Sequence, residues 1–268
     1  MSTRSTAVDI RGADTAQAIE WVQTIYAIPG DENPLFDTTG AFARLGEVGD
    51  TLYLAGSFND DVRVFDVEFG DTLVVPLVNT VSDEFTNSLP DLREDVLQFT
   101  QDVDITELFL RVDIGNDGHI DFEKRLDVAG VKYFPEIEFP EETKPARQFF
   151  IEPRPEDKFI FEAPDNAVIG EPFPEDGAAS ESYTSGYYAQ IAGLPKGEHK
   201  LAFGGTAFGG EVAISVTDII TVANERPGSH DGKNDGPHAD GANDAGDGAP
   251  ADGYGHDAAP VEACDWIC

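Results

Sequence analysis

The chain has 268 residues, of which 52 are acidic and 17 basic, so its formal net charge is -35. This charge excludes nucleic acid and anionic membrane surfaces as expected partners, because both repel carboxylates. Apolar residues make up 40% of the chain, which excludes disorder throughout. So large a negative charge repels itself strongly in ordinary buffer, whereas at molar salt the Debye length falls to about 3 Å and the repulsion is screened. We therefore expect a halophilic source.

The first part of the chain predicts an arm and one helix. Residues 1–12 contain no apolar run typical of a secretory signal and are expected to form an N-terminal arm. From Asp14 to Ile28 apolar residues recur at helical spacing. Asp14 and Gln17 are placed to form a capping box, and Pro29-Gly30 ends the pattern. We therefore expect a helix over residues 14–28.

The remainder of the body, up to residue 222, predicts mostly strands. Residues 92–101 predict one further short helix. Charged and apolar residues mostly alternate in 63–69, as in a sheet with one wet face. The expected strands are short and rich in Val, Ile, Phe and Tyr, at 51–58, 62–69, 72–79, 107–114, 119–128, 147–152, 158–162, 186–193, 198–203 and 211–222. They predict a mainly β fold, an antiparallel β-sandwich or jelly roll formed by residues 13–222. No apolar run approaches the roughly 20 residues that span a bilayer, so we expect no membrane span.

The composition changes abruptly after the last expected strand. Residues 223–263 are rich in Gly, Asp and His and contain no Leu or Phe, which predicts a disordered acidic tail. Its three histidines, His230, His238 and His256, could bind divalent metals loosely. Residues 264–268 form a separate motif that carries the only cysteines, Cys264 and Cys268. Their spacing permits a disulfide or an inter-subunit link, and a zinc site would need two further ligands.

Several short motifs resemble a family of uncharacterised, generally secreted bacterial and archaeal proteins, over roughly residues 20 to 222. In the first half these are Asn33-Pro34-Leu35, Asp37, Thr39-Gly40, Leu54-Ala55-Gly56, Arg63, Val75-Pro76 and Asn79. In the second half they are Gly186-Tyr187-Tyr188, residues 194–199, Phe203-Gly204-Gly205 and the strand from Val216 to Val222. The resemblance implies no particular chemistry. The chain departs from the family at Glu68-Phe69-Gly70, where members carry Pro-Ala-Gly, and in its missing export signal.

The segment from Asp113 to Asp121 permits two interpretations. Asp113, Asn116, Asp117 and Asp121 surround Gly118, as oxygen ligands do in a calcium loop. However, Lys124 stands where such a loop carries its bidentate Glu. The other interpretation is a β-hairpin that turns at Asn116-Asp117-Gly118. We expect the hairpin, which could hold calcium or sodium weakly.

Two further sets of residues are candidate ligand sites. Asp37, Asn79 and His199 could converge as a ligand or metal site, although Asn33 to Gly40 has the composition of Asx and Ser/Thr turns. Tyr187 and Tyr188 could line an aromatic groove for carbohydrate, or belong to the core.

The sequence contains none of the common catalytic motifs for nucleophilic hydrolysis, zinc-dependent proteolysis, or phosphate or dinucleotide binding. We therefore expect a non-catalytic structural or recognition protein of a halophile cell surface or virus-like particle, which associates with itself or with other surface or particle proteins. The alternatives are a hydrolase acting on surface polysaccharide or peptide, and a calcium-dependent carbohydrate-binding module.

Overall fold

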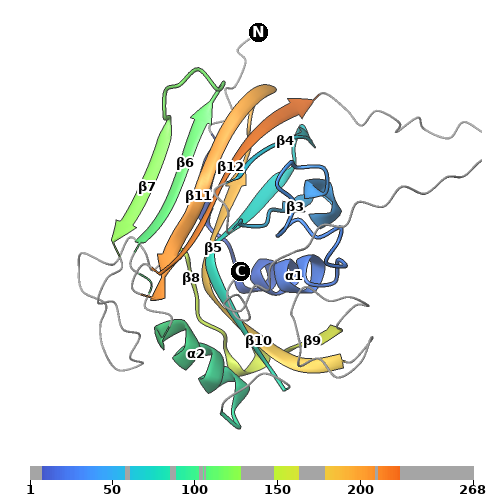
Figure 1. Ribbon diagram of the computed structural model, residues 1–268, viewed down its shortest axis with the longest axis vertical. Helices are drawn as coiled ribbons and strands as arrows, with labels where there is room; N and C mark the ends of the chain where they lie inside the picture. Colours follow the sequence, from blue (N-terminus) through green and yellow to red (C-terminus); the bar gives the residue numbers. More distant parts are fainter. Residues whose placement is uncertain are drawn as a thin grey trace, which may run out of the picture.

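The computed structural model describes residues 8–57, 61–84, 89–102, 105, 107–127, 148–162, 179–208 and 211–223. Its described part is a sandwich of two β-sheets with a helix on one outer face and a second helix at one end (Figure 1). No helix in these residues has the length and apolar character needed to cross a membrane. The predicted mainly β fold with two helices is therefore confirmed.

Sheet A is built around two long strands, β5 (Thr72–Asp83) and β10 (Ala179–Ala192), which pair antiparallel. On the far side of β10 lie β1 (Asp9–Gly12), β8 (Phe150–Ile151) and β9 (Phe159–Glu162). On the far side of β5 lie β3 (Thr51–Tyr53) and then β2 (Glu47–Val48). A short 3-10 helix, η1 (Ala43–Gly46), precedes β2, and another, η3 (Pro155–Asp157), separates β8 from β9.

Sheet B has the strand order β4-β12-β11-β6-β7. Its members are β4 (Asp61–Glu68), β12 (Val212–Ala223), β11 (Gly197–Ala207), β6 (Glu107–Ile114) and β7 (Phe122–Asp127). All neighbours are antiparallel except β4 and β12, which run parallel. The edge strand β4 therefore reaches sheet B through a crossover from sheet A, because β3 precedes it and β5 follows it in the chain.

The main core fills the space between the two sheets. Leucines and valines of β5 face Phe203 of β11 and Val216 of β12, and these residues are fully buried. A second core lies between sheet A and helix α1 (Thr15–Ile25), which buries Trp21, Val22 and Ile25 against Tyr188. The Trp21 indole donates a hydrogen bond of 2.6 Å to the Leu54 carbonyl. This bond satisfies the one polar group of the most voluminous fully buried side chain.

The start of α1 is formed as the sequence predicts. The Asp14 carboxylate accepts a hydrogen bond from the Gln17 amide at 2.9 Å, and the Gln17 side chain accepts one from the Asp14 amide at 3.1 Å. This reciprocal capping box satisfies two amides that a helix start leaves free. It fixes the position at which the chain leaves β1 and enters the helix.

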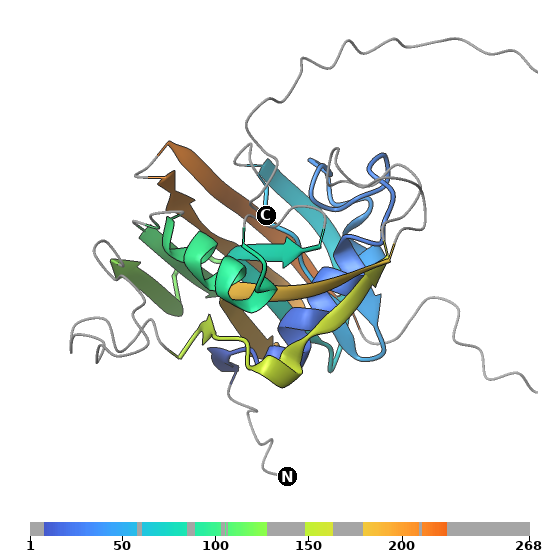
Figure 2. The same ribbon diagram turned by 90° about the horizontal axis from the view of Figure 1, so that it is seen from below.

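Helix α2 (Leu92–Asp102) lies across one end of the sandwich, as the view from below shows (Figure 2). Val96 and Leu97 pack against Tyr183 of β10. The interface also contains polar groups, because the buried Asp95 carboxylate accepts a hydrogen bond of 2.6 Å from Ser82 and one of 2.9 Å from the Leu89 amide. Thr80 and Thr100 bond to each other at 2.6 Å.

Several boundaries differ from the sequence-based expectation. Residues 9–12, expected in an N-terminal arm, form β1, a short strand held by backbone pairing with β10. Strand β10 begins at Ala179, seven residues before its expected start, because the Ser- and Thr-rich segment 180–185 is buried beside α2. Strand β7 begins at Phe122 because residues 115–121 belong to the turn. Of the expected tail 223–263, Ala223 is the last residue of β12, and the remainder and the motif 264–268 lie outside the described residues.

Candidate binding surface

The loop after α1 is organised by two of the motif residues. Asn33 is buried, donates hydrogen bonds of 2.6 and 2.9 Å to the carbonyls of Ile25 and Ile28, and accepts one of 2.9 Å from the Leu35 amide. Asp37 accepts hydrogen bonds from the amides of Thr39, Gly40 and Phe42 and from the Thr39 hydroxyl. Burial alone would raise the pKa of Asp37, but these donors, above all the Phe42 amide, hold it below its ordinary value. Both side chains are thus occupied in shaping the loop.

Arg63 of β4 and Asp218 of β12 form an ion pair with no solvent exposure. The guanidinium donates from Nε to Oδ1 at 2.7 Å and from Nη2 to Oδ2 at 2.9 Å. It also donates to the carbonyls of Ala55 at 2.8 Å and Pro34 at 3.2 Å. Two parallel hydrogen bonds between a guanidinium and a carboxylate provide the close geometry that a buried ion pair needs to offset its loss of hydration. Arg63 therefore joins the loop after α1, the segment after β3 and sheet B.

Asn79 and Gly186 meet directly across the β5–β10 pair. Gly186 has φ +138°, and a Cβ on it would lie 2.5 Å from the Val78 carbonyl oxygen and 2.6 Å from the Asn79 Cα. Only glycine fits this approach. Asn79 itself is fully buried, and neither atom of its side-chain amide has a hydrogen-bond partner.

The segment from Asp113 to Asp121 forms the expected hairpin between β6 and β7. The Asp113 carboxylate accepts from the amides of Asp117 at 3.1 Å and Gly118 at 2.9 Å, and Asp121 accepts from the Ile114 amide at 2.7 Å. The Asn116 amide donates to Glu198 at 2.6 Å. Within the described residues, no group of three or more His, Cys, Asp or Glu side chains is arranged to hold a metal ion.

His199 adjoins this hairpin. Its Nδ1 accepts a hydrogen bond of 3.1 Å from the Gly115 amide, so Nε2 carries the proton and donates to the Pro195 carbonyl at 2.6 Å. The imidazole, which is 2% exposed, thus links the hairpin to the start of β11. A second ligand for this ring would have to displace one of these two bonds.

The structure does not bring Asp37, Asn79 and His199 together. A Cβ on Gly205 would lie 2.7 Å from the Val78 side chain, which places Asn79 near Gly205 on β11. His199 lies six residues earlier on the same strand, a distance of about 20 Å. Asp37 lies in the loop that Arg63 anchors.

Tyr187 and Tyr188 do not form a surface groove. Neighbouring residues of a strand point to opposite faces, so Tyr187 enters the core between the sheets and Tyr188 enters the core under α1. Both are buried, and burial raises the pKa of Tyr187 to about 12. The two rings contribute to packing on both sides of β10.

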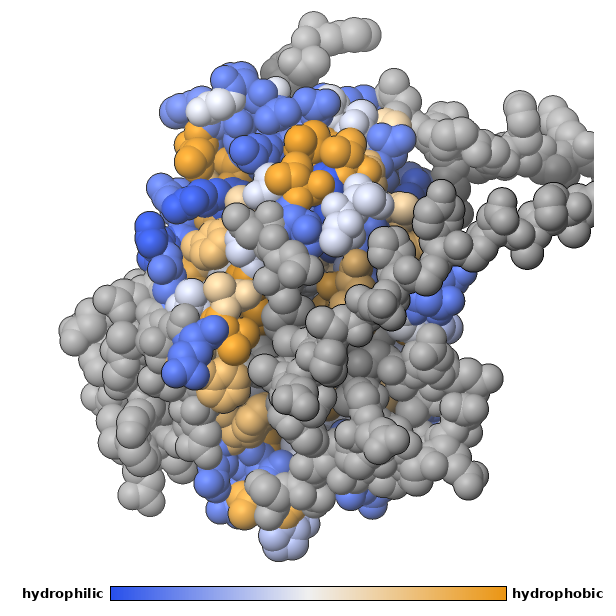
Figure 3. Space-filling model, in the orientation of Figure 1, coloured by the Kyte–Doolittle hydropathy of each residue, from blue (hydrophilic) through white to orange (hydrophobic). Residues whose placement is uncertain are grey.

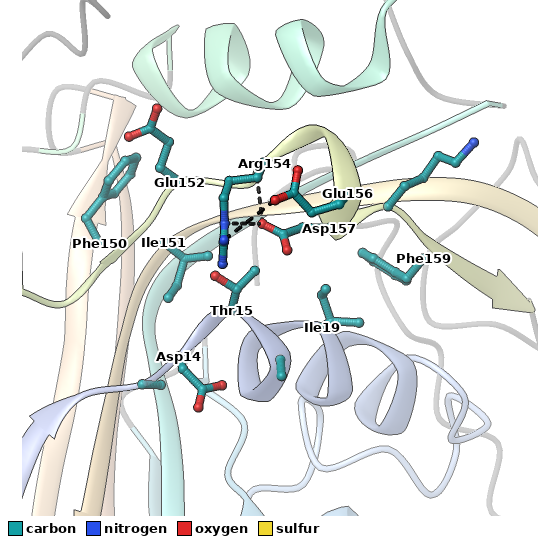
Figure 4. A pocket seen from close by; sticks show the side chains of 13 residues that line it. Asp14, Thr15, Ile19, Phe150, Ile151, Glu152, Arg154, Glu156, Asp157 and Phe159 are labelled. Carbon is teal, nitrogen blue, oxygen red and sulfur yellow. Dashed lines mark hydrogen bonds and ion pairs between the residues drawn. The ribbon is translucent and has the colours of Figure 1, made fainter.

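A groove of about 710 Å³ separates the first turn of α1 from the segment that links β8 to β9. Its floor includes Ile19, Ile151 and Phe159. Arg154 extends across it toward Thr15, and its guanidinium lies 3.6 Å from Glu156 and 3.4 Å from Asp157 (Figure 4). The guanidinium is thus already paired with carboxylates of its own segment.

The outer face of sheet B is uncovered by any described helix or strand. The strand register places these side chains on it: Val62, Val64 and Asp66 of β4; Ala213, Ser215, Thr217, Ile219 and Thr221 of β12; Glu198, Lys200, Ala202 and Thr206 of β11; Glu107, Phe109, Arg111 and the buried Asp113 of β6; Glu123 and Arg125 of β7. Val62 and Val64 are 58% and 59% exposed. Figure 3 shows apolar side chains gathered among hydrophilic ones over the upper ends of these strands.

Two neighbouring rows form the centre of this face. One row contains Val64, Ile219, Lys200 and the buried Asp113, and the next contains Val62, Thr217, Ala202 and Arg111. Arg111 pairs with Glu123 at 2.8 Å and lies 5.5 Å from the Phe109 ring centroid. We call these two rows the central rows. They combine an uncharged half on β4 and β12 with a basic half on β11 and β6.

The free edge of β4 is partly closed. The Val64 amide donates a hydrogen bond of 2.9 Å to the Thr39 carbonyl, and Gly40 lies so close that a Cβ would be 2.8 Å from the Val64 carbonyl oxygen. The loop after α1 therefore blocks the addition of a further strand at this point. The part of β4 that remains accessible to a partner is its outward face, which carries Val62 and Val64.

The sequence analysis did not identify this face. The sequence signal for it was the order Val62-Arg63-Val64, in which the alternation of the strand puts Arg63 on the opposite face from Asp66 and Glu68.

The proposed disulfide or link at Cys264 and Cys268 lies outside the described residues. In comparisons with known proteins, no family model, no curated protein and no solved structure matches the chain.

Proposed function

We propose that the protein is a salt-adapted, non-catalytic structural or recognition protein of a halophile cell surface or virus-like particle, and that the outer face of sheet B is its contact surface. The observation that carries the proposal is which side chains of β4 point inward and which point outward. Arg63 is buried between Val62 and Val64, which are each more than half exposed. An exposed aliphatic stripe on a strand with an inward-pointing arginine suits a surface that receives a partner.

The use of the motif residues supports a structural role. Asn33, Asp37, Arg63 and His199 all bond to backbone carbonyls or amides, as described above. Their hydrogen-bonding capacity serves the position of loops and strands. A role of this kind is what a structural or recognition protein requires of its polar interior.

The charge supports adaptation to salt. Residues 1–222 contain 42 acids and 15 bases, so 15 - 42 gives a charge of -27 on the part of the chain that contains the sandwich. At low salt this charge would oppose both folding and association. At molar salt a Debye length of about 3 Å confines each charge to its nearest neighbours.

Fractionation of producing cells in their own molar salt tests the proposal. We expect the native protein with the envelope or particle fraction, and we expect Val64→Glu to shift it to the supernatant. The matched control is Ile160→Glu, which places the same charge on an exposed aliphatic residue of β9 in sheet A. Recovery of wild type as a free monomer that hydrolyses a polysaccharide or peptide would overturn the proposal.

A further inference from the structure

We infer that the occupant of the outer face of sheet B is a second copy of this chain, which packs face to face through the central rows. The inference rests on the proposed function and names the partner of that same surface. It predicts a two-fold symmetric dimer in which sheet B of one copy lies on sheet B of the other.

The charge of the central rows fits a second copy. With 52 acidic residues in the chain, most of its surface would bring carboxylate against carboxylate in a symmetric pair. The central rows expose Lys200 and Arg111 and no acidic side chain, and Glu123 at the rim is already paired with Arg111. Buried Asp113, beside Lys200, bonds to backbone amides of its own hairpin. Contact between two copies here therefore avoids acid–acid repulsion.

The order of residues is also self-complementary. Consider a two-fold axis that lies in the interface, perpendicular to the strands and midway between the central rows. It places β4 of one copy over β4 of the other, and it places each central row over the other row of the second copy. Val64 then lies over Val62 of the second copy, Ile219 over its Thr217, and Lys200 over its Ala202. Valine therefore meets valine, Ile219 meets the methyl and hydroxyl of a threonine, and no lysine meets a lysine. Two sheets packed in this way lie about 10 Å apart, as in the interior of a sandwich.

The size of the face sets the strength of the pair. Five strands about 4.8 Å apart and six residues of about 3.3 Å each give a face of about 20 by 20 Å. Two copies would bury roughly 800 Å², below the roughly 1,200 Å² of a stable interface. The dimer is therefore weak, and it forms at molar salt, where repulsion between the two negatively charged bodies is screened.

Sedimentation equilibrium of the full, reduced chain tests the inference. Reduction keeps Cys264 and Cys268 from linking copies. In about 3 M KCl, where the Debye length is below about 3 Å, we expect the mass to rise from 28.9 kDa toward twice that value with concentration. We expect Val64→Glu to weaken dimerisation at least tenfold, because each dimer then buries two unpaired carboxylates, and Ile160→Glu to behave as wild type.

Two results would overturn the inference. One is a wild-type protein that stays monomeric at about millimolar concentration in this salt, because a dissociation constant above about 1 mM is too weak for a specific pair. The other is a dimer that Val64→Glu leaves intact. Val64→Thr, which keeps the shape of the side chain, replaces Val64→Glu if circular dichroism shows that the charged variant is unfolded. A smaller but measurable weakening is then expected, because burying a hydroxyl costs less than burying a carboxylate, and unchanged dimerisation overturns the inference. A monomer that still fractionates with the envelope would refute the second copy and leave the proposed function standing.

Discussion

Asp218 accepts both hydrogen bonds of the Arg63 guanidinium fork, at 2.7 and 2.9 Å, although neither side chain reaches solvent. The pair connects the edge strand β4 to its parallel neighbour β12. Parallel strands cannot be joined by a tight turn, so side-chain links of this kind help to fix where β4 docks. The same arginine holds the carbonyls of Pro34 and Ala55, so the edge of sheet B and the loop after α1 depend on one side chain.

Arg63→Met is expected to lower the free energy of unfolding by about 3–5 kcal/mol, because it leaves the Asp218 carboxylate buried without a partner. The double variant Arg63→Met and Asp218→Leu is expected to recover most of this loss, since two apolar side chains can replace a buried ion pair. Urea unfolding in molar salt measures both. Equal losses in the single and double variants would show that the carboxylate is not the cause.

The pH dependence of stability is expected to report on Asp37. Its pKa in the folded protein lies below its ordinary value, so its contribution to stability is present above about pH 4 and is lost as the pH falls through the folded pKa. Asp37→Asn has a single side-chain oxygen, so the partly buried Phe42 amide loses its acceptor, at a cost of about 1–3 kcal/mol near pH 7. The difference between wild type and Asp37→Asn should narrow below pH 4. A constant difference from pH 7 to pH 2 would contradict this.

Two buried asparagines are expected to respond in opposite ways to the same substitution. Asn33→Leu removes three hydrogen bonds to backbone groups and should cost about 2–4 kcal/mol. Asn79→Leu removes an amide that has no partner and should leave stability unchanged or raise it by about 1 kcal/mol. Thermal unfolding of the two variants compares them directly. A large loss for Asn79→Leu would mean that its amide binds something that stabilises the fold.

The sequence predicted the architecture because the signals for it are local. Alternating apolar residues mark strands, Asp14 and Gln17 mark a helix start, and Asp117-Gly118 marks a hairpin turn, whatever the rest of the chain does. Strands β1 and β2 were missed because they consist of only four and two residues, too few to show an alternating pattern. Their existence depends on the edges of β10 and β3, which one segment cannot reveal.

The candidate surface could not be predicted because it depends on which way β4 faces. Read alone, the segment from Arg63 to Phe69 places Asp66 and Glu68 on a wet face, and the alternation leaves Arg63 on the other face, where a charge is not expected. The structure turns Arg63 inward because Asp218, 155 residues later in the chain, is there to receive it. Val62 and Val64 are then forced outward. The local pattern shows only that Arg63 is out of phase with Asp66 and Glu68, and it does not reveal the distant carboxylate that makes this possible.

Calcium is expected to have no specific effect on the hairpin from Asp113 to Asp121. Its carboxylates are engaged by backbone amides, and Lys124 follows in β7. A calcium site would raise stability by about 2.7 kcal/mol at a hundredfold excess over its dissociation constant. We expect the melting temperature in calcium chloride to match that in sodium chloride of equal ionic strength. A calcium-specific rise that Asp117→Ala abolishes would contradict this and restore the calcium site.

Folding is expected to require salt. When potassium chloride is lowered from molar concentration to about 0.1 M, the Debye length grows from about 3 to 10 Å, so carboxylates that were screened from one another repel again. The exposed ion pairs, such as Arg154 with Glu156, cannot offset this, because such pairs contribute about 1 kcal/mol or less each. The free energy of unfolding should therefore fall steadily with salt, and circular dichroism should show loss of β structure in dilute buffer. Sucrose at equal osmolarity is the control, since it strengthens burial without screening charge. Full β structure and an unchanged melting temperature at 0.1 M would show that the acidic residues serve another purpose.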